Sequence, residues 1–303
     1  MYPYQWMFLL TGLVTVLVGF SLWWILPDSP SKATFLTEKE RLIAVERIKD
    51  NMTGTKNYTH KKEQVWECVT DIKIWLLFLN IFLHNLTGPL QSTFAGLIIK
   101  GFGFTTYQAI LLNIPPAVTW FIGVVSAGLT LSTKWGDNKR LLFMILFCIP
   151  GIAAALILKL VPDDPSLKGV RLLGVYLTPV SAATSIIMYT LLASNVAGYT
   201  KKVVAGSMFF TAFATAQIVA PQAYLDSQAP NYQTGINLAL GALLSIIGVT
   251  CLIGFLYWRE NEKRRALMRA AGEDPHAEGT VDDLILAFSD LTDGQNKRLI
   301  YKL

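Results

Sequence analysis

Hydrophobic residues in this chain are gathered into long uninterrupted runs that are separated by short polar turns. Seven runs are long enough to cross a membrane, since a hydrocarbon core of about 30 Å takes about 20 residues of helix. They cover residues 6–26, 74–98, 108–131, 141–160, 172–194, 204–223 and 236–258. The runs lack the short alternating period of membrane barrel strands. The pattern predicts an all-α polytopic membrane bundle with about seven transmembrane helices.

The composition agrees with a bilayer environment. Of the 303 residues, 52% are hydrophobic and 16% are charged, with a mean hydropathy of +0.43, whereas soluble domains carry about 25% charged residues. The Lys and Arg residues behind the net charge of +5 lie beside the apolar runs, so they do not indicate a nucleic-acid partner. The three cysteines have no disulfide or metal spacing. No cofactor and no metal are predicted.

The positions of Lys and Arg predict how the chain is oriented in the membrane. Positive residues are concentrated in alternate loops, namely the first loop, the turn at residues 134–140, the Lys201–Lys202 pair and the tail. The positive-inside rule places these loops in the cytosol. The N-terminus is therefore expected outside and the C-terminal tail inside.

These features divide the chain into four parts. Residues 1–26 are predicted to form one retained transmembrane helix, because the run is too long for the apolar core of a signal peptide. Residues 27–73 are predicted to form a cytosolic loop with a short amphipathic helix, since Thr37 and Glu40 have capping-box spacing. Residues 74–258 are predicted to form six transmembrane helices. Residues 259–303 are expected to be a cytosolic tail whose end is disordered or loosely docked.

Polar residues recur at helical spacing in several of the runs. Inside a bilayer such residues usually face the bundle interior or a water-filled cavity. In the second run four of them fall within about 40° of one another at 100° per residue. The fifth and sixth runs carry similar rows, and an asparagine precedes Pro115–Pro116 in the third. The candidate cavity residues are Asn80, His84, Thr87, Gln91, Asn113, Ser185, Tyr189, Thr211 and Gln217.

These polar rows have two interpretations. Ser and Thr often donate to their own helix or join neighbouring helices, and we favour this role for the hydroxyls of the fifth and sixth runs. For Asn80, His84 and Gln91 we favour the cavity slightly, because their polar groups are too large to be satisfied locally. His84 is the one ionisable side chain deep in any run.

Short motifs along the chain carry a resemblance. A Leu-Pro-Asp-Ser-Pro run at residues 26–30 follows the first apolar run, residues 71–75 enter the second, and residues 195–202 follow the fifth. Residues 221–222 close the sixth, and residues 288–293 lie in the tail. In this order they resemble the anion:cation symporter family of the major facilitator superfamily, and within it the fungal allantoate-permease branch.

The resemblance implies the C-terminal half of a twelve-helix carrier together with its sixth helix. It implies proton-coupled alternating-access transport of a small organic anion, such as allantoate, pantothenate or nicotinate, at the plasma membrane. Because the substrate site lies between two halves, the missing N-terminal half or a partner chain would be needed. Either His84 or that missing half would supply the charge that an anion or proton pathway needs. The turn that ends the third run is similar to the gating loop of the superfamily. Its candidate residues are Gly128, Lys134, Asp137, Lys139 and Arg140.

Three alternatives compete with this interpretation. A seven-helix receptor would share the number and orientation of the runs, although the chain lacks an extracellular cysteine pair. An intramembrane enzyme would need a Ser/His dyad, paired carboxylates or metal ligands, and no such catalytic set occurs in the runs. The last alternative is a truncated chain that does not transport by itself or that works only with a partner.

Overall fold

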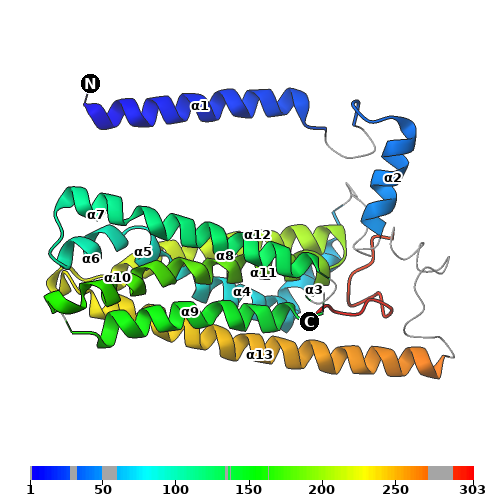
Figure 1. Cartoon of the computed structure of the whole chain (residues 1–303). Coiled ribbons are helices and arrows are strands. Elements are labelled where there is room, and N and C mark those ends of the chain that lie inside the picture. Colours follow the sequence, from blue (N-terminus) through cyan, green and yellow to red (C-terminus); the bar gives the residue numbers. More distant parts are fainter. Residues whose placement is uncertain are drawn as a thin grey trace.

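The computed structural model describes residues 2–27, 33–49, 60–133, 136, 138–162, 164–271 and 289–303. Within these ranges the regular structure is entirely helical, which confirms the all-α fold. Figure 1 shows long helices lying side by side in a bundle, with α1 (Pro3–Ile25) running alongside but separate from it. None of the apolar window of α1 is buried.

Six helical segments of the described chain are long and apolar enough to span a membrane, and they coincide with six of the seven predicted runs. The segments are Tyr4–Ile25, Thr106–Ser132, Arg140–Leu160, Pro165–Asn195, Tyr199–Ala223 and Gln233–Ala270. The remaining run, residues 74–98, does not form one continuous helix.

That run is divided into α4 (Ile72–Asn85), α5 (Gly88–Gln91) and α6 (Ala95–Gly101). The cause is Gly88–Pro89, because proline has no N–H to donate and disfavours a helical residue before it, while glycine weakens a helix. The Thr87 N–H bonds to the carbonyl of His84, three residues back, as in a tighter 3₁₀ turn. The break therefore follows directly from local sequence.

Proline lies at three further changes of helical form. Pro115–Pro116 follows Asn113, where α7 gives way to α8. Pro179 lies in a 3₁₀ segment between α10 and α11, and Pro221 lies in a second one after α12. The bounds are α7 Thr106–Leu112, α8 Ile114–Ser132, α9 Arg140–Leu160, η2 Pro165–Leu167, α10 Lys168–Leu177, η3 Thr178–Ala182, α11 Ala183–Asn195, α12 Tyr199–Val219, η4 Ala220–Ala223, η5 Asp226–Gln228 and α13 Gln233–Ala270.

The core lies where α4, α9, α11, α12 and α13 meet. Leu77, Met144 and Ile187 are fully buried in its largest cluster. Alanines at the same contacts let helices approach closely, which is how helices associate in lipid, where apolar burial by itself favours no partner. This packing holds α4 against α12 and α13 and so positions the polar row of α4.

Two segments flank the bundle. The predicted short helix is present as α2 (Glu38–Lys49), and the expected capping pair forms, with the Thr37 N–H donating to Glu40 at 2.8 Å. The short α3 (Lys62–Thr70) leads into α4. At the other terminus, the expectation of a disordered or loosely docked tail is wrong for residues 289–303. They return to the bundle beside α3 (Figure 1), and Asp293 and Tyr301 are buried there.

Candidate functional site

The polar row of α4 begins with Asn80, which is 0% exposed. Its Nδ2 donates to Thr250 Oγ1 of α13 at 3.0 Å. One turn later lies His84, which is 6% exposed. Within the described residues, neither Asn80 Oδ1 nor His84 Nδ1 has a hydrogen-bond partner. Buried polar atoms are nearly always paired, so two unpaired atoms one helical turn apart distinguish this interface from ordinary packing.

The same row continues into the break after α4. The hydroxyl of Thr87 donates to the carbonyl of His84 at 2.8 Å, and Gln91 Nε2 lies 3.3 Å from Thr87 Oγ1. The Gln91 amide also lies 3.4 Å from Ser181 Oγ, which belongs to η3. The non-helical breaks of the α4–α6 run therefore lie next to η3, the 3₁₀ segment between α10 and α11. Two irregular segments of backbone share one polar contact.

The candidates on α11 and α12 form a separate group. Ser185 donates to the carbonyl of Ala182 at 2.7 Å, and Thr211 donates to the carbonyl of Ser207 at 2.9 Å. These hydroxyls are thus satisfied by their own helices. Tyr189, which is 46% exposed, packs its ring 6.1 Å from that of Phe209.

Of the last two cavity candidates, Gln217 lies in the last turn of α12 and Asn113 lies between two helices. Gln217 is exposed, and its side-chain nitrogen lies 3.5 Å from where a Cβ on Gly88 would be. Gln217 therefore extends to the break in the second run. Asn113 is exposed at the junction of α7 and α8. The structure brings together Asn80, His84, Thr87 and Gln91, and it leaves Asn113, Tyr189 and Thr211 outside that buried group.

The predicted gating turn is described in part. Gly128 is exposed on α8, Lys139 is exposed before α9, and Lys134 and Asp137 lie outside the described residues. Arg140 Nη1 donates to Ser194 Oγ at 2.8 Å, which joins the start of α9 to the end of α11. Its backbone N–H donates to the Leu303 carbonyl at 2.7 Å. The part of the turn that the structure describes thus ties α9 to α11 and to the tail.

Sequence reasoning missed Thr250 as a partner of Asn80. Thr250 lies among apolar residues, and the other Ser or Thr of the run, Ser245, is five residues away, so no helical row marks it. The helix that carries it, α13, packs extensively on α4 and α9. Thr250 is buried at the first of these contacts.

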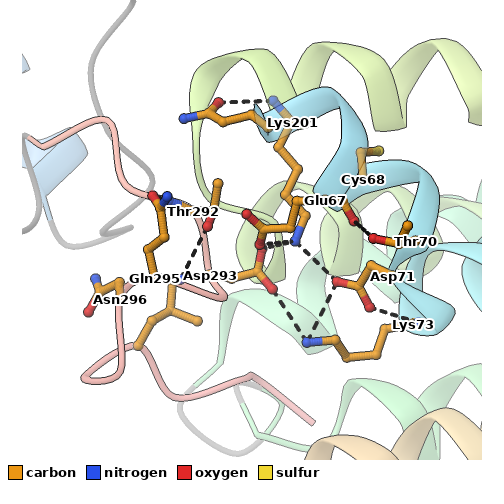
Figure 2. Close-up of polar contacts among 12 residues, drawn as sticks. Glu67, Cys68, Thr70, Asp71, Lys73, Lys201, Thr292, Asp293, Gln295 and Asn296 are labelled. Carbon is orange, nitrogen blue, oxygen red and sulfur yellow. Dashed lines mark hydrogen bonds and ion pairs between the residues drawn. The ribbon is translucent and has the colours of Figure 1, made fainter. Parts of the chain in front are cut away.

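A cluster of buried charges at the tail-side end was also missed. Lys201, at the start of α12, is 0% exposed and lies between carboxylates from α3, from the start of α4 and from the tail. Figure 2 shows its side chain reaching toward Glu67, Asp71 and Asp293. Burial opposes ionisation of Asp293, but Lys201 and Lys73 outweigh it and hold the pKa of that carboxyl below its usual value. The partners are far apart in the chain, so no local motif marks them.

The family model described as Major Facilitator Superfamily matches residues 1–221 of this chain. The chain belongs to the Major Facilitator Superfamily. Its apolar helical segments and this membership make it an integral membrane protein. No solved structure matches the chain.

Several curated relatives within the superfamily are similar over almost the whole chain. The uncharacterized transporter C417.10 of Schizosaccharomyces pombe is 31% identical over 297 residues, which are 98% of this chain and 56% of the relative. The allantoate permease of Saccharomyces cerevisiae is 29% identical over 98% of this chain and 54% of its own length. The MFS-type transporter cnsL of Penicillium expansum is 31% identical over 90% and 57%. This member of the superfamily therefore spans about half the length of the curated relatives that it matches.

Proposed function

We propose that this chain is part of a secondary carrier that moves a small organic anion across a membrane by alternating access. Its superfamily and its relatives, one of them named allantoate permease, support transport. Carriers of this kind bind substrate between two halves. Because the chain covers about half of its relatives, the proposal includes a second half, supplied by a longer chain or by a partner chain.

The observation that carries the proposal is the unpaired polar pair Asn80 Oδ1 and His84 Nδ1 beside a broken helix. A buried polar atom without a partner costs about 1–3 kcal/mol. Irregular backbone at membrane depth is tolerated where it is buried in protein or lines a water-filled cavity. A substrate group or a water molecule at this position would form hydrogen bonds with both atoms. Binding of such a group would explain why two buried polar side chains lie here.

The chemistry of these groups fits a carboxylate or ureido acid. A protonated His84 would pair with a carboxylate, and the amides of Asn80 and Gln91 can both donate and accept, as a ureido group requires. Loss and uptake of the His84 proton would couple anion movement to protons. Allantoate, pantothenate and nicotinate share the carboxylate, and allantoate also carries ureido groups.

The same proposal includes location and reaction type. Alternating positive loops support an N-terminus outside and a cytosolic tail, and the resemblance to allantoate permeases supports the plasma membrane. In the described residues no group of three or more His, Cys, Asp or Glu residues could hold a metal. We propose a transporter without enzymatic activity that acts without a cofactor.

An uptake assay tests the role of His84. The longest reading frame that contains this chain is expressed in yeast cells that lack their own allantoate uptake, and labelled allantoate is followed from about pH 5 to 8. Native uptake is expected to rise toward acid pH, and His84→Ala is expected to lose most of that rise. His60→Ala, at an exposed histidine before α3, is the matched control. Native uptake and pH dependence in His84→Ala would exclude the proposed role.

A second comparison tests whether the chain works as a half. The 303-residue chain starting at Met1 is expressed beside the longest reading frame, and surface levels are matched by an epitope tag. Uptake by the longer protein together with none by the shorter chain is the expected result. Equal uptake by the two proteins would contradict the need for a second half. No uptake of any tested carboxylate by the longer protein would contradict the transport proposal.

A further inference from the structure

Residues 289–303, called the tail segment below, lie across the ends of several helices without forming a helix themselves. Two asparagine side chains each donate one hydrogen bond to its backbone and accept one from it, as the backbone of a neighbouring β-strand would. Asn195 donates to the carbonyl of Lys302 at 2.9 Å and accepts from the N–H of Lys302 at 2.8 Å. Asn261 forms the same pair of bonds with Tyr301, each at 2.8 Å. The tail segment is thereby held in one register against α11 and α13.

A charged group holds the same segment from the side of α13. Arg264 is buried, and its guanidinium donates to the backbone carbonyls of Asp293 at 2.7 Å and Asn296 at 3.3 Å. It also donates to the Leu299 carbonyl and to the Tyr301 hydroxyl. One arginine therefore satisfies tail carbonyls that would otherwise be buried without a donor, which a long hydrophobic side chain could not do.

Opposite Arg264 lies the docking cluster, which we define as Glu67, Asp71, Lys73, Lys201 and Asp293. Lys201 Nζ lies 2.7 Å from Asp293, 2.9 Å from Glu67 and 3.1 Å from Asp71. Lys73 Nζ lies 3.4 Å from the other oxygen of Asp293, which also accepts from the Tyr301 hydroxyl at 2.6 Å. Figure 2 shows Asp293 between the two lysines. Asp293 is the tail segment's contribution to this cluster.

The cluster joins elements that carry the candidate site. Lys201 lies in the first turn of α12, Asp71 precedes α4, and Glu67 lies on α3. A carboxylate from the tail segment thus adds to the direct Lys201–Asp71 ion pair between the tail-side ends of α12 and α4. Inside a protein, paired charges are favourable only while each keeps its partners. Loss of Asp293 would leave Lys73 without its closest carboxylate and would remove the tail segment's charge from Lys201.

We propose that the tail segment is an intramolecular tie that holds the ends of α3, α4 and α12 together and limits how far they separate. Asp293 is its anchoring residue. A carrier that alternates between two open states must separate helices at one end at a time, so a removable tie at this end would set how readily that end opens. The tie itself is a property of this chain and can be tested without any transport.

A native thiol reports the separation of α3 from α12. Cys68 on α3 is 0% exposed, and its sulfur lies 3.8 Å from the sulfur of Met208 on α12. Burial raises the pKa of the Cys68 thiol to about 11, so a maleimide reacts slowly while α3 and α12 stay together. The other two cysteines, Cys148 and Cys251, are replaced by serine so that Cys68 is the single thiol.

The experiment follows maleimide labelling of Cys68 in the purified whole chain in detergent. Asp293→Asn and deletion of residues 289–303 are each expected to raise the labelling rate roughly tenfold or more, because local opening controls access to buried groups. Lys297→Gln changes an exposed charge of the same segment and is expected to leave the rate unchanged. Unchanged rates in both Asp293→Asn and the deletion variant would overturn the proposal.

Adding the tail segment back as a peptide distinguishes loss of the tie from misfolding of the deletion variant. A synthetic peptide of residues 289–303 is added to the deletion variant, and the same peptide carrying Asp293→Asn serves as the control. The native peptide is expected to bring labelling back toward the rate of the undeleted chain, whereas the control peptide is expected to have little effect. Equal results with the two peptides would overturn the role of Asp293.

Discussion

At the end of the bundle where the tail segment docks, Lys201 is surrounded by three carboxylates, whereas at the opposite end a single buried cation lies against aromatic rings. There Arg171 donates to Asn231 at 2.6 Å, and its guanidinium carbon lies 4.2 Å from the centre of the Phe102 ring. Beside it, Phe94 stacks on Tyr224 with ring centres 4.2 Å apart. The tail-side end has ring contacts of its own, since Tyr301 stacks on Tyr257 with ring centres 4.7 Å apart and Arg264 lies over the Tyr301 ring. What distinguishes it is the lysine that lies among three carboxylates.

The two arrangements should respond differently to damage. Ion pairs in a buried cluster depend on every member, since removing one leaves uncompensated charge. Ring contacts and cation–π contacts are individually weaker, so the loss of one of them lowers the stability of the protein only slightly. The tail-side end also depends on the last residues of the chain, while the opposite end is built from segments inside the bundle. Substitutions at the two ends can therefore be compared directly.

The largest effect is expected from Lys201→Met. The substitution leaves Glu67 and Asp71 without this lysine and keeps Asp293 paired only with Lys73. Breaking a buried pair in this way costs about 3–5 kcal/mol. Thermal unfolding in detergent should show a clear fall in Tm. Lys297→Met, at an exposed position of the tail segment, is the control, and equal falls in the two variants would contradict the account.

A smaller effect is expected from Asp293→Asn, because Lys201 keeps Glu67 and Asp71. Loss of hydrogen bonds to a charged group costs about 1.5–3 kcal/mol. Because the folded pKa of Asp293 is depressed, its stabilisation is present above its unfolded pKa of about 3.9. It is lost as pH falls through the folded value.

This gives a pH-dependent comparison of native chain and Asp293→Asn. The Tm difference between them should be largest at neutral pH and should become smaller as the pH falls below the pKa of Asp293 in the unfolded chain. Tm measured at several pH values for both proteins checks this. A difference that grows on acidification would contradict the depressed pKa.

The smallest effect is expected at the opposite end, from Arg171→Lys. Lysine keeps the charge but has no planar group to stack on Phe102. The loss should be about 0.5–2 kcal/mol. Labelling of Cys68 should not change, because the contact with Phe102 lies at the other end of the bundle from the docking cluster. Faster Cys68 labelling in Arg171→Lys would show that the two ends are coupled and would remove the basis of the comparison.

Structural features that depend on residues close together in the sequence were predictable from it. Apolar runs of sufficient length locate the helices because lipid offers no partner for an open backbone. Glycine and proline weaken a helix through their own backbone chemistry, and the second run is broken at Gly88–Pro89. The back-bonding favoured for Ser185 and Thr211 is present, because the acceptor carbonyl lies within one turn of the same helix.

What the sequence by itself determined is the membrane character, the helical runs and the superfamily, since each depends on residues close together or on motifs in order. Only the tertiary structure decided that Asn80 meets Thr250 and that Lys201 meets Asp293. These contacts join residues far apart in the chain, and their partners are single residues without a repeating pattern. Whether these residues come into contact depends on how the helices pack and on where the tail segment docks. Neither of these can be predicted from a local sequence pattern.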